Sequence, residues 1–598
     1  MMNLARALEL AVAAARAGGE ILRADFHRPG GPRGKLDKAE ADTEAERLIR
    51  GELTAGFPRC GFLGEETGRV AGESGQPIWL VDPNDGTRDY LVGRRGSTVS
   101  IGLVRGGRPL LGVVYAFGYP DDRGDLFAWA EGCGPLRRNG HPLAPGLPAA
   151  LAPSDVVLVS SKGDRDPDAN LECVAPARYR TVPSIAHRLA LVAAGEAAAA
   201  TSLHAPGAWD YAAGQALLSA VGAVLVDEAG REVGYAADGW SATSRAFVGL
   251  LPVARELATR PWTLTAGHAG DVPVRPRAGE AVADPGRLSR AQGCLLGQVA
   301  GDSLGSLVEF QSAVEVAARY PGGPRRLEDG GRWRTLAGQP TDDSEMALAL
   351  ARAIVSGGGY DPEQVLRAYR EWKRSEPFDM GTTTRAALSG YLVGESQANG
   401  SLMRASPLGV FGHALPAERA AALGRGDSLL THPHAVCRDS VAAFVVALAH
   451  AIRQGDGAQA AYQAALGWAQ RNAAAPVVGA LRAATREAPV CDSEQHGFVL
   501  VALQNAFFEL LHAPSLEAAV VATVLRGGDT DTNAAIAGAL LGAVHGREAV
   551  PPQWRAMILS CRPHPLRARH PRPPACWPVD AYELAERLLL VGAAAARG

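Results

Sequence analysis

The hydrophobic pattern of this chain changes near residue 287, and this change divides the chain into two differently built halves. Before it, short apolar runs typical of strands occur at 78–82, 97–107 and 109–117. After it, strand patterns nearly vanish and apolar residues recur at helical spacing. The helices predicted there span 288–301, 344–356, 362–374, 438–453, 456–471, 498–511, 515–525 and 532–545.

A segment rich in glycine, proline and charge lies between the halves at 266–287 and has no periodicity. Such a composition favours a linker. We therefore predict an α/β domain over 1–265, a linker over 266–287 and an all-helical domain over 288–598. The length of 598 residues accommodates two large enzyme domains.

The N-terminal sequence MMNLARALELAVAAARAGGEIL resembles a signal peptide at first sight. Arg6, Glu9 and Arg16 interrupt its apolar run, however, and its apolar side chains recur at helical spacing. We therefore predict an amphipathic helix over 3–27, followed by a second helix over 39–56.

The composition is that of a globular protein, with 47% hydrophobic and 21% charged residues and a net charge of −3. It excludes a disordered chain and a globally basic nucleic-acid-binding protein. No run of about 20 uncharged apolar residues occurs, so we expect no membrane span. The basic, proline-rich tail at 561–574 is interpreted as an extended surface segment rather than a nucleic-acid patch.

The 8 cysteines are scattered along the chain and form no C-x-x-C pair. This spacing argues against a disulfide framework and against a zinc site. Buried thiols in a reducing compartment are the simpler interpretation, so we expect a cytoplasmic protein.

The first acidic cluster of interest is WLVDPNDGTRDY, in which Asp82 ends a predicted strand and Gly86-Thr87 open a helix. Carboxylates such as those of Asp82 and Asp85 hold hard cations through oxygen. Free backbone N–H groups at a helix start hold an anion. The pattern thus predicts a site for metal and phosphate, although the hexapeptide D-P-N-D-G-T alone also fits a surface turn.

Four further segments accompany this one along the first half: Lys35, Asp42 with Glu46, Gly64-Glu65-Glu66, and Trp209-Asp210-Tyr211-Ala212-Ala213. In their order and spacing, the five segments resemble the motifs of the inositol monophosphatase superfamily over residues 3–250. The resemblance implies a layered αβαβα fold. It also implies hydrolysis of a small phosphate monoester, of either a nucleotide type or a sugar or inositol type.

The resemblance further implies two or three Mg²⁺ (or Mn²⁺) ions, bound by Glu65, Asp82, Asp85, Asp210 and the main-chain carbonyl of Asn84. Thr87, oriented by Asp42, would position the attacking water, and the amides of Gly86 and Thr87 would bind the phosphate. Bound metal would neutralise the phosphate charge and lower the pKa of water.

Three features depart from the family pattern. Asn84 stands where leucine or isoleucine is usual, and only its carbonyl is expected to matter. The segment TVPSIAHR (181–188) replaces a G-[ST]-[AS]-A turn that shapes the substrate pocket. No acid precedes Trp209, where inositol-type members carry a glutamate. These departures disfavour inositol phosphate as substrate, and the run WDYAAGQALLSAVGA is closer to the nucleotide 3′-phosphatases.

The second half has two acidic clusters, each opening a predicted helix: Thr341-Asp342-Asp343 and Gly527-Gly528-Asp529-Thr530-Asp531-Thr532. Two such clusters that converge would form a dinuclear cation site, because like charges at close range need a metal between them. Taken singly, each also fits a helix cap, since Asp342 and Glu345 have capping-box spacing.

These clusters belong to a longer ordered set of segments, at 287–310, 338–351, 378–388, 398–411, 431–440 and 526–543. The set resembles the ADP-ribosylglycohydrolases of the ADP-ribosyl-dinitrogen-reductase hydrolase type, over residues 288–560. The resemblance implies a compact helical bundle and two Mg²⁺ or Mn²⁺ ions ligated by Thr341, Asp342, Asp343, Asp529, Asp531 and Thr532.

The same resemblance implies that the carboxylate of Glu309 approaches the metals and assists cleavage. It also implies an ADP-ribose-binding loop, formed by Asn399, Gly400, Ser401 and Met403, with His432 and Gly528 nearby. Taken alone, His432 also fits a structural loop histidine.

The sequence therefore predicts a bifunctional metal-dependent hydrolase. The C-terminal domain would cleave the N- or O-glycosidic bond of an ADP-ribosylated protein or small molecule, and the N-terminal domain a phosphate monoester. The alternative is an ADP-ribose-binding module in which one domain is catalytically silent. Neither a membrane nor a nucleic acid is expected as partner.

Overall fold

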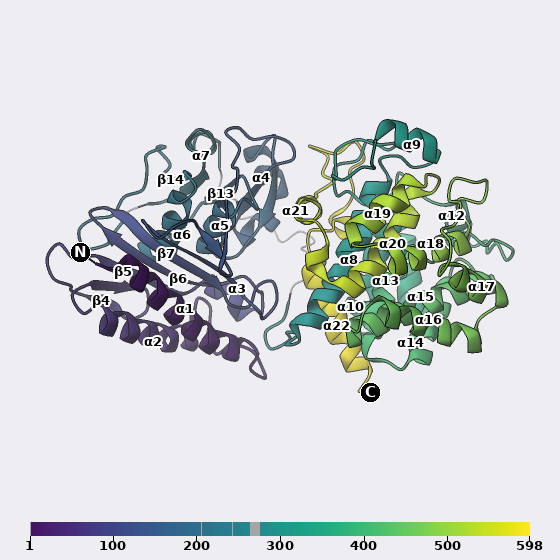
Figure 1. The fold of residues 1–598 in the computed structure, drawn as a ribbon, viewed down its shortest axis with the longest axis horizontal. Coiled ribbons are helices and arrows are strands. Elements are labelled where there is room, and N and C mark those ends of the chain that lie inside the picture. The colour runs from purple at the N-terminus through teal and green to yellow at the C-terminus, as the bar shows by residue number, and fades with distance from the viewer. Residues whose placement is uncertain (1, 205, 242, 263–275, 598) are drawn as a thin grey trace. The chain divides into compact units, whose positions relative to one another are not determined.

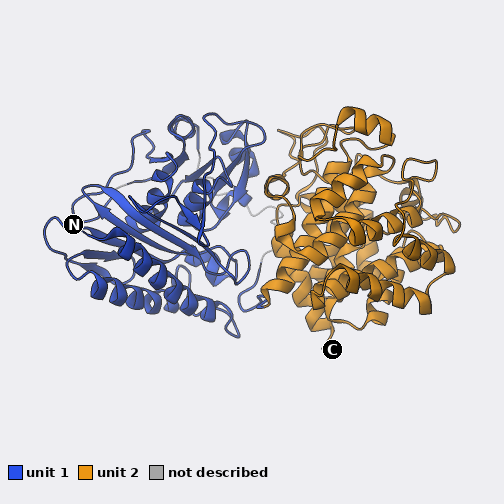
Figure 2. Cartoon of the chain, viewed as in Figure 1, with its two compact units in different colours: residues 1–283 blue, residues 284–598 orange. Residues whose placement is uncertain are grey.

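The structure, a computed structural model, describes residues 2–204, 206–241, 243–262 and 276–597. The chain divides into two compact units, residues 1–283 and residues 284–598 (Figure 2). Unit 1 is α/β and unit 2 is helical (Figure 1), so the predicted fold class is confirmed at this level. Within the predicted linker 266–287, residues 266–275 lie outside the described ranges, and helix α8 already begins at Pro285.

Unit 1 contains an eight-stranded sheet in the order β10-β9-β8-β7-β6-β5-β3-β4. Only β3 and β5 pair in parallel. The strands are β3 (Gly61–Gly64), β4 (Gly68–Val70), β5 (Ile78–Asp85), β6 (Thr98–Arg105), β7 (Arg108–Ala116), β8 (Asp125–Ala130), β9 (Arg137–Arg138) and β10 (His141–Pro142). A separate pair, β1 (Gly34–Lys35) and β2 (Lys38–Ala39), precedes the second helix.

Helices cover both faces of this sheet. On one face, α1 (Leu4–Phe26) and α2 (Glu40–Gly56) pack their alanines against Trp79, Ile101 and Leu111. On the other face, α6 (Ala208–Ser219) approaches so closely that a Cβ on Gly112 would lie 2.1 Å from the Ala213 carbonyl oxygen. Glycine is therefore required at this contact.

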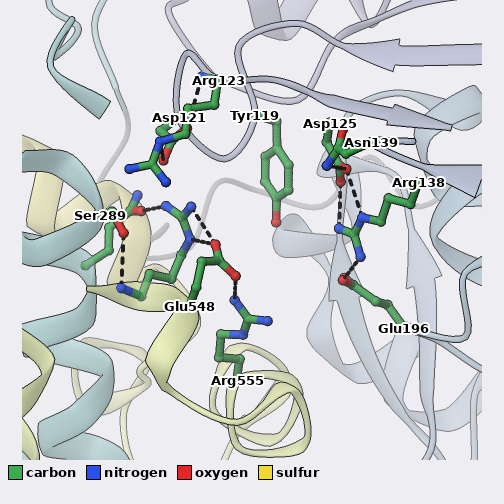
Figure 3. A network of polar contacts seen from close by, with 12 residues as sticks. Tyr119, Asp121, Arg123, Asp125, Arg138, Asn139, Glu196, Ser289, Glu548 and Arg555 are labelled. Atoms are coloured by element: carbon green, nitrogen blue, oxygen red, sulfur yellow. Dashed lines mark hydrogen bonds and ion pairs between the residues drawn. The ribbon is translucent and has the colours of Figure 1, made fainter. Parts of the chain in front are cut away.

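The second sheet of unit 1 has five strands in the order β12-β11-β13-β15-β14. They are β11 (Val156–Val159), β12 (Arg178–Thr181), β13 (Ala199–Ser202), β14 (Val224–Val226) and β15 (Ala246–Gly249), and the accompanying helices are η1 (Ser161–Arg165), α4 (Pro167–Cys173), α5 (Ile185–Ala193) and α7 (Leu251–Ala258). Arg138 on β9 connects the two sheets, because it pairs with Asp125 on β8 and with Glu196 just before β13 (Figure 3).

Unit 2 is built around the pair α8 (Pro285–Gly305) and α20 (Thr530–His545). Its remaining helices are α9 (Ala313–Arg319), α10 (Asp342–Gly357), α11 (Pro362–Arg374), α12 (Thr382–Leu388), α13 (Ser406–Phe411), η2 (Gly412–Ala414), α14 (Ala417–Leu429), α15 (Ala435–Gln454), α16 (Ala458–Asn472), α17 (Ala475–Ala483), α18 (Val499–His512), α19 (Leu516–Leu525), η3 (Arg547–Ala549), α21 (Pro552–Ser560), η4 (Pro574–Cys576) and α22 (Ala581–Ala595).

Small residues make the central contact of unit 2. A Cβ on Gly297 of α8 would lie 2.1 Å from the Gly538 carbonyl oxygen of α20, and a Cβ on Gly542 would lie 2.0 Å from the Gly293 carbonyl oxygen. The two backbones therefore touch directly. This contact places the first turn of α20, with its acids, against the C-terminal end of α8.

Helix α15 is the one helix in the described ranges that is long and apolar enough to cross a membrane by length and composition, with a mean hydropathy of 1.6. However, 83% of its apolar window is buried inside the unit, as in the core helix of a globular domain. All the cysteines are free, and all but Cys133 are buried, as predicted.

The prediction of a purely surface-exposed tail at 561–574 is wrong in part. Arg572 is buried, and its Nε and Nη2 donate to the two carboxylate oxygens of Glu345 on α10 at 2.7 and 2.9 Å. A buried acid distant in sequence therefore compensates this arginine. The segment is irregular, as expected, but part of it belongs to the core.

Candidate active sites

In unit 1, the DPNDGT segment lies where β5 ends and α3 (Thr87–Leu91) begins. The pairing of β5 with β6 shifts register between Asp82 and Asp85, so the ladder is irregular in the segment that separates the two acids. The Asn84 amide N–H donates to Asp82 Oδ1 at 2.8 Å. Gly86 then takes a φ of 102°, a left-handed conformation that favours glycine, and the chain turns into α3.

Three carboxylates from separate elements converge at this turn. Oxygens of Glu65 after β3, Asp82 on β5 and Asp210 on α6 lie within 4.8 Å of one another. Burial, together with repulsion from neighbouring acids, raises the pKa values of Asp82 and Asp210 well above their ordinary range. Desolvation of the carboxyl and repulsion from the same acids raise the pKa of Glu65 to about 7, although this residue is exposed. A hard divalent cation would relieve this repulsion.

Residues at the start of α5 bind the carboxylate of Asp85. Its Oδ2 accepts hydrogen bonds from Ser184 Oγ at 2.6 Å and from the Ala186 amide N–H at 2.7 Å. Ser184 also caps α5, by accepting from the His187 amide N–H. The atypical segment 181–188 therefore orients Asp85, while burial raises the pKa of that carboxyl.

The side chain of Asn84 takes part in the site, although only its carbonyl was expected to matter. Its Nδ2 donates to Asp42 Oδ1 at 2.8 Å. Thr87 Oγ1 lies 3.1 Å from Asp42 Oδ2 and 2.9 Å from the Asn84 carbonyl oxygen. Burial raises the pKa of Asp42 to about 7, although these two bonds favour its charged form.

Unit 2 has its own group of converging carboxylates, formed by Glu309, Asp379 and Asp531, whose oxygens lie within 4.8 Å of one another. Glu309 is buried, and Trp333 Nε1 donates to its Oε2 at 2.6 Å. Burial and the charge of Asp379 raise the pKa of Glu309 to about 8. Burial also raises the pKa of Asp379 to about 6 and that of Asp531 well above its ordinary range.

The first acidic cluster does not form the capping box that its spacing also fitted. Thr341, at the N-cap of α10, donates its hydroxyl to Asp302 Oδ1 at 2.9 Å and lies 3.0 Å from Asp343 Oδ2. Glu345 instead accepts from Trp372 Nε1 at 2.7 Å and pairs with Arg572. No acid at the start of α10 therefore caps the N-terminus of the helix with its side chain.

The second cluster likewise lacks a side-chain cap, since Asp529 at the N-cap of α20 bonds elsewhere. Oδ2 of Asp529 accepts from Asn399 Nδ2 at 2.7 Å. In the first cluster, by comparison, Asp342 Oδ2 accepts from the Gly381 amide N–H at 3.1 Å. Thr532 is buried beside Asp531, whose Oδ1 accepts the Thr532 amide N–H.

The predicted ADP-ribose loop packs against His432. A Cβ on Gly400 would lie 2.9 Å from His432 Cε1, and Ser401 Oγ lies 2.9 Å from Ser428 Oγ. His432 is buried, and burial together with the charge of Arg404 lowers its pKa to about 3. It is therefore a neutral imidazole, and its Nδ1 lies 2.8 Å from Thr431 Oγ1.

Two other members of the predicted ADP-ribose set are bonded within the unit. The Gly528 amide N–H donates to the Gln311 carbonyl oxygen at 2.8 Å, and its own carbonyl accepts from the Phe310 amide. The Met403 carbonyl accepts from Gln298 Nε2 at 3.0 Å. The peptide of Gly528 thus fixes the loop after Glu309 beside the start of α20.

Both carboxylate groups have the chemistry of a divalent-cation site. In unit 2, Asp343 Oδ1 is buried and has no hydrogen-bond partner among the described residues. Burial and repulsion from Asp302 and Asp342 raise the pKa of Asp343 well above its ordinary range. An unpartnered buried carboxylate oxygen among other acids fits a cation as its missing partner.

Sequence reasoning missed three residues of the unit 2 site: Asp302, Asp379 and Trp333. Asp302 lies in the segment 287–310 and Asp379 in the segment 378–388, and spacing alone did not separate them from the neighbouring residues of those segments. Asp302 accepts from Thr341 and from the Ser344 amide, which anchors the start of α10. Trp333 stands in a loop that carried no motif.

Comparison with known proteins assigns each unit to a family model. Residues 3–261 match the model described as the inositol monophosphatase family. Residues 283–593 match the model described as ADP-ribosylglycohydrolase.

Individual relatives agree with this division. The ADP-ribosyl-[dinitrogen reductase] glycohydrolase of Rhodospirillum rubrum is 30% identical over 285 residues, which are 46% of this chain and 92% of that protein. Inositol monophosphatase 1 of Solanum lycopersicum is 32% identical over 245 residues, which are 38% of this chain and 87% of that protein. The ADP-ribosylarginine hydrolase Tri1 of Pseudomonas putida is 29% identical over 297 residues, which are 45% of this chain and 73% of that protein.

Proposed function

The chain belongs to the inositol monophosphatase family through its first unit and to the ADP-ribosylglycohydrolase family through its second, and we propose that each unit carries a metal-dependent hydrolase site. One observation carries the proposal: in each unit, three carboxylates from three separate segments converge within 4.8 Å. The packing of α1 and α6 on opposite faces of the larger sheet also supports an αβαβα order of layers for unit 1.

In unit 2, the proposed reaction is hydrolysis of the glycosidic bond of an ADP-ribosylated substrate. The proposed ligands of two Mg²⁺ or Mn²⁺ ions are Thr341, Asp342, Asp343, Asp529, Asp531 and Thr532. Bound ions supply Lewis-acid polarisation of the ribose hydroxyls beside the anomeric carbon. Asn399, through its bond to Asp529, would couple the ADP-ribose loop of residues 399–403 to the ligand set.

Glu309 is the proposed proton carrier of this reaction. Water adds to the anomeric carbon while the bond to the leaving group breaks, so one proton must pass from water to the leaving group. The buried carboxyl of Glu309 has an oxygen within 4.8 Å of one on the proposed ligand Asp531, a place from which it can take a proton from water and return it to the leaving group. Trp333 holds Oε2 of Glu309, which leaves Oε1 to carry the proton.

The proposed attachment site of the ADP-ribose is an arginine side chain. The relative from Pseudomonas putida is named an ADP-ribosylarginine hydrolase, and the similarity covers most of that protein. The surroundings of Glu309 also suit a positively charged guanidinium group, since Asp379 and Asp529 both place negative charge near Glu309.

In unit 1, the proposed reaction is hydrolysis of a phosphate monoester. The proposed metal ligands are Glu65, Asp82, Asp85, Asp210 and the carbonyl of Asn84. Bound ions supply charge neutralisation of the phosphate and a lowered pKa of water. Thr87, held between Asp42 and the Asn84 carbonyl, would orient the attacking water, and the amides of Gly86 and Thr87 would hold the phosphate.

A chelation experiment tests the shared metal requirement. The protein is treated with EDTA, and release of phosphate and of ADP-ribose is followed while Mg²⁺ or Mn²⁺ is returned. Both activities should disappear on chelation and return with the metal. An activity that persists in EDTA would refute the metal-dependent proposal for that unit.

A further inference from the structure

A segment near the C-terminus of unit 2 contacts two of the segments that carry site acids, although it supplies none of the proposed metal ligands. We call residues 570–577 the C-terminal strap. The strap contains η4, which packs against α10. Its first part belongs to the tail that was expected to lie on the surface, so its buried contacts call for an explanation.

Arg572 of the strap joins the start of α10 to the end of α11. It is buried, and its Nε and Nη2 donate to the two carboxylate oxygens of Glu345 on α10 at 2.7 and 2.9 Å. Its Nη1 donates to the Ser375 carbonyl oxygen at 2.7 Å, and Nη2 also donates to Ser375 Oγ at 2.8 Å. Ser375 is the C-cap of α11. One guanidinium therefore binds two elements that are not consecutive in space along the chain.

The segment 375–381, which begins at this serine, reaches the site acids through two residues. Asp379 lies in the segment, and one of its carboxylate oxygens is within 4.8 Å of an oxygen of Glu309. The Gly381 amide N–H donates to Asp342 Oδ2 at 3.1 Å. The position of the segment therefore determines where Asp379 lies and whether Asp342 Oδ2 keeps its donor.

The backbone turn that follows Ser375 is strained. Glu376 takes a φ of 54°, a left-handed conformation that costs energy for a residue with a side chain. Such a conformation persists only where surrounding contacts impose it. The two hydrogen bonds from Arg572 to Ser375 are contacts of this kind, made at the residue before the turn.

His570 of the strap supports the same segment. Its ring stacks on Phe378 with the ring centroids 4.7 Å apart, and the Phe378 and Trp333 centroids are 5.8 Å apart. Trp333 is the residue that donates to Glu309. The His570 carbonyl oxygen accepts from Gln339 Nε2 at 2.9 Å, just before α10. The strap thus contacts the segments on both sides of the acidic group.

A second ion pair fastens the C-terminal region to α10 without reaching the site. Arg352, farther along α10, donates to the two carboxylate oxygens of Asp580 at 2.7 and 2.8 Å and to the Trp577 carbonyl oxygen. None of these partners carries a site acid or lies in the segment 375–381. This pair therefore provides a comparison for a contact that only stabilises the unit.

Resting on the proposed hydrolase site of unit 2, we propose that Arg572 is a positioning residue for that site. By binding both Glu345 and Ser375, it fixes the two segments relative to each other and so sets the spacing of the site acids that they carry. A guanidinium suits this role, because its planar fork binds a carboxylate with two N–H groups and keeps donors for a second partner.

Binding of Mn²⁺ tests the proposal without a substrate. The manganese that wild type binds and that Asp342→Ala does not bind defines the unit 2 site, and electron paramagnetic resonance of free Mn²⁺ measures its affinity. The double variant Glu345→Gln/Arg572→Met removes both charges together, so no unpaired buried charge remains. We expect its unit 2 affinity for Mn²⁺ to fall about tenfold or more, as for other residues that orient metal ligands.

The matched control is the double variant Arg352→Met/Asp580→Asn. It should lower Tm and leave the affinity for Mn²⁺ unchanged, because its residues do not contact the segment 375–381. Arg572→Lys keeps the charge beside Glu345 but not the fork, and we expect a loss of affinity of about threefold or more. If the first double variant does not fold, Arg572→Lys alone tests the proposal.

The possible results are distinguishable. Wild-type affinity in Arg572→Lys, or in the folded double variant at Glu345 and Arg572, would overturn the proposal and leave the metal site in place. An equal loss of affinity in the Arg352 control would also overturn it, because affinity would then follow stability. If wild type and Asp342→Ala bind the same amount of Mn²⁺, the proposed function of unit 2 fails together with the role of Arg572.

Discussion

Asn84 Nδ2 lies 2.8 Å from Asp42 Oδ1, while the second oxygen of Asp42 accepts from Thr87. Both side chains that orient the proposed attacking water are thus linked to the residue whose carbonyl is a proposed metal ligand. A leucine or isoleucine at position 84, the usual family residue, makes no such bond. The asparagine therefore adds a polar contact that compensates the burial of Asp42.

Asn84→Leu should impair phosphate release through Asp42. Loss of this bond removes an interaction that favours the charged carboxyl, so the pKa of Asp42 rises above its value of about 7. A larger share of Asp42 is then protonated at neutral pH. We expect about a tenfold loss of kcat at pH 7, partial recovery at higher pH and unchanged ADP-ribose release. A pH–rate profile identical to that of wild type would contradict this account.

Trp333→Phe should impair ADP-ribose release. The indole donates to Glu309 Oε2 at 2.6 Å, and a hydrogen bond to an ionised group contributes roughly 1.5–3 kcal/mol. We expect at least about a tenfold loss of kcat and a shift of the Glu309 limb of the pH profile to higher pH. Phosphate release from the same preparation is the internal control. Unchanged kinetics of ADP-ribose release would show that Trp333 has no role in this reaction.

Without metal, the protein should lose stability as pH rises. The pKa values of Asp42 and Glu65 are raised to about 7 and that of Glu309 to about 8, above their unfolded values. The folded state therefore binds protons more tightly, and the stability linked to these protons is lost progressively as pH rises from the unfolded pKa values to the folded ones. In EDTA, Tm should fall between about pH 4 and pH 8 and change little above that range.

Added Mg²⁺ should reverse this trend, because a cation replaces the protons and binds only the folded state. The Tm difference between Mg²⁺ and EDTA should therefore grow as pH rises. Differential scanning calorimetry at several pH values measures both effects. A metal effect that shrinks toward high pH would contradict the assignment of these acids to cation sites.

Gly538→Ala should destabilise unit 2 alone. The new Cβ would meet the Gly297 carbonyl oxygen at 2.1 Å, so α8 and α20 must separate, at a cost of about 1–3 kcal/mol or more. Gly479→Ala on α17 is the matched control, since a Cβ there has no atom within 4 Å, and it should stabilise the helix by roughly 0.5–1 kcal/mol. Equal effects of the two substitutions on unfolding would contradict the proposed packing.

The sequence alone predicted the elements that carry local periodicity. The strand at 78–82 and the helix at 362–374 appear where expected, although β5 continues to Asp85. Motifs of consecutive residues, such as Asp82 to Thr87 and Thr341 to Asp343, were located because turn chemistry and charge mark them. The residues that lie beside these motifs in space were predicted only where a family resemblance indicated them.

Residues whose role depends on distant partners were harder to predict. Asp379 comes close to Glu309 and Asp531 only through the tertiary fold. No motif in its own segment indicates that this acid belongs to a site. Arg572 looked like a surface charge because its partner Glu345 lies far away in sequence. Asp342 and Glu345 have the spacing of a capping box, but the carboxylate of Glu345 instead accepts hydrogen bonds from Trp372 and Arg572.

The most direct test of two independent active sites is a matrix of three proteins and two reactions. Wild type, Asp85→Ala and Asp342→Ala are assayed with Mg²⁺ for phosphate release from adenosine 3′,5′-bisphosphate and for ADP-ribose release from an ADP-ribosylarginine protein. We predict that wild type performs both reactions, Asp85→Ala only the second and Asp342→Ala only the first. The assignment of one hydrolase site to each unit would be contradicted if one folded variant lost both reactions. It would also be contradicted if both variants kept both reactions.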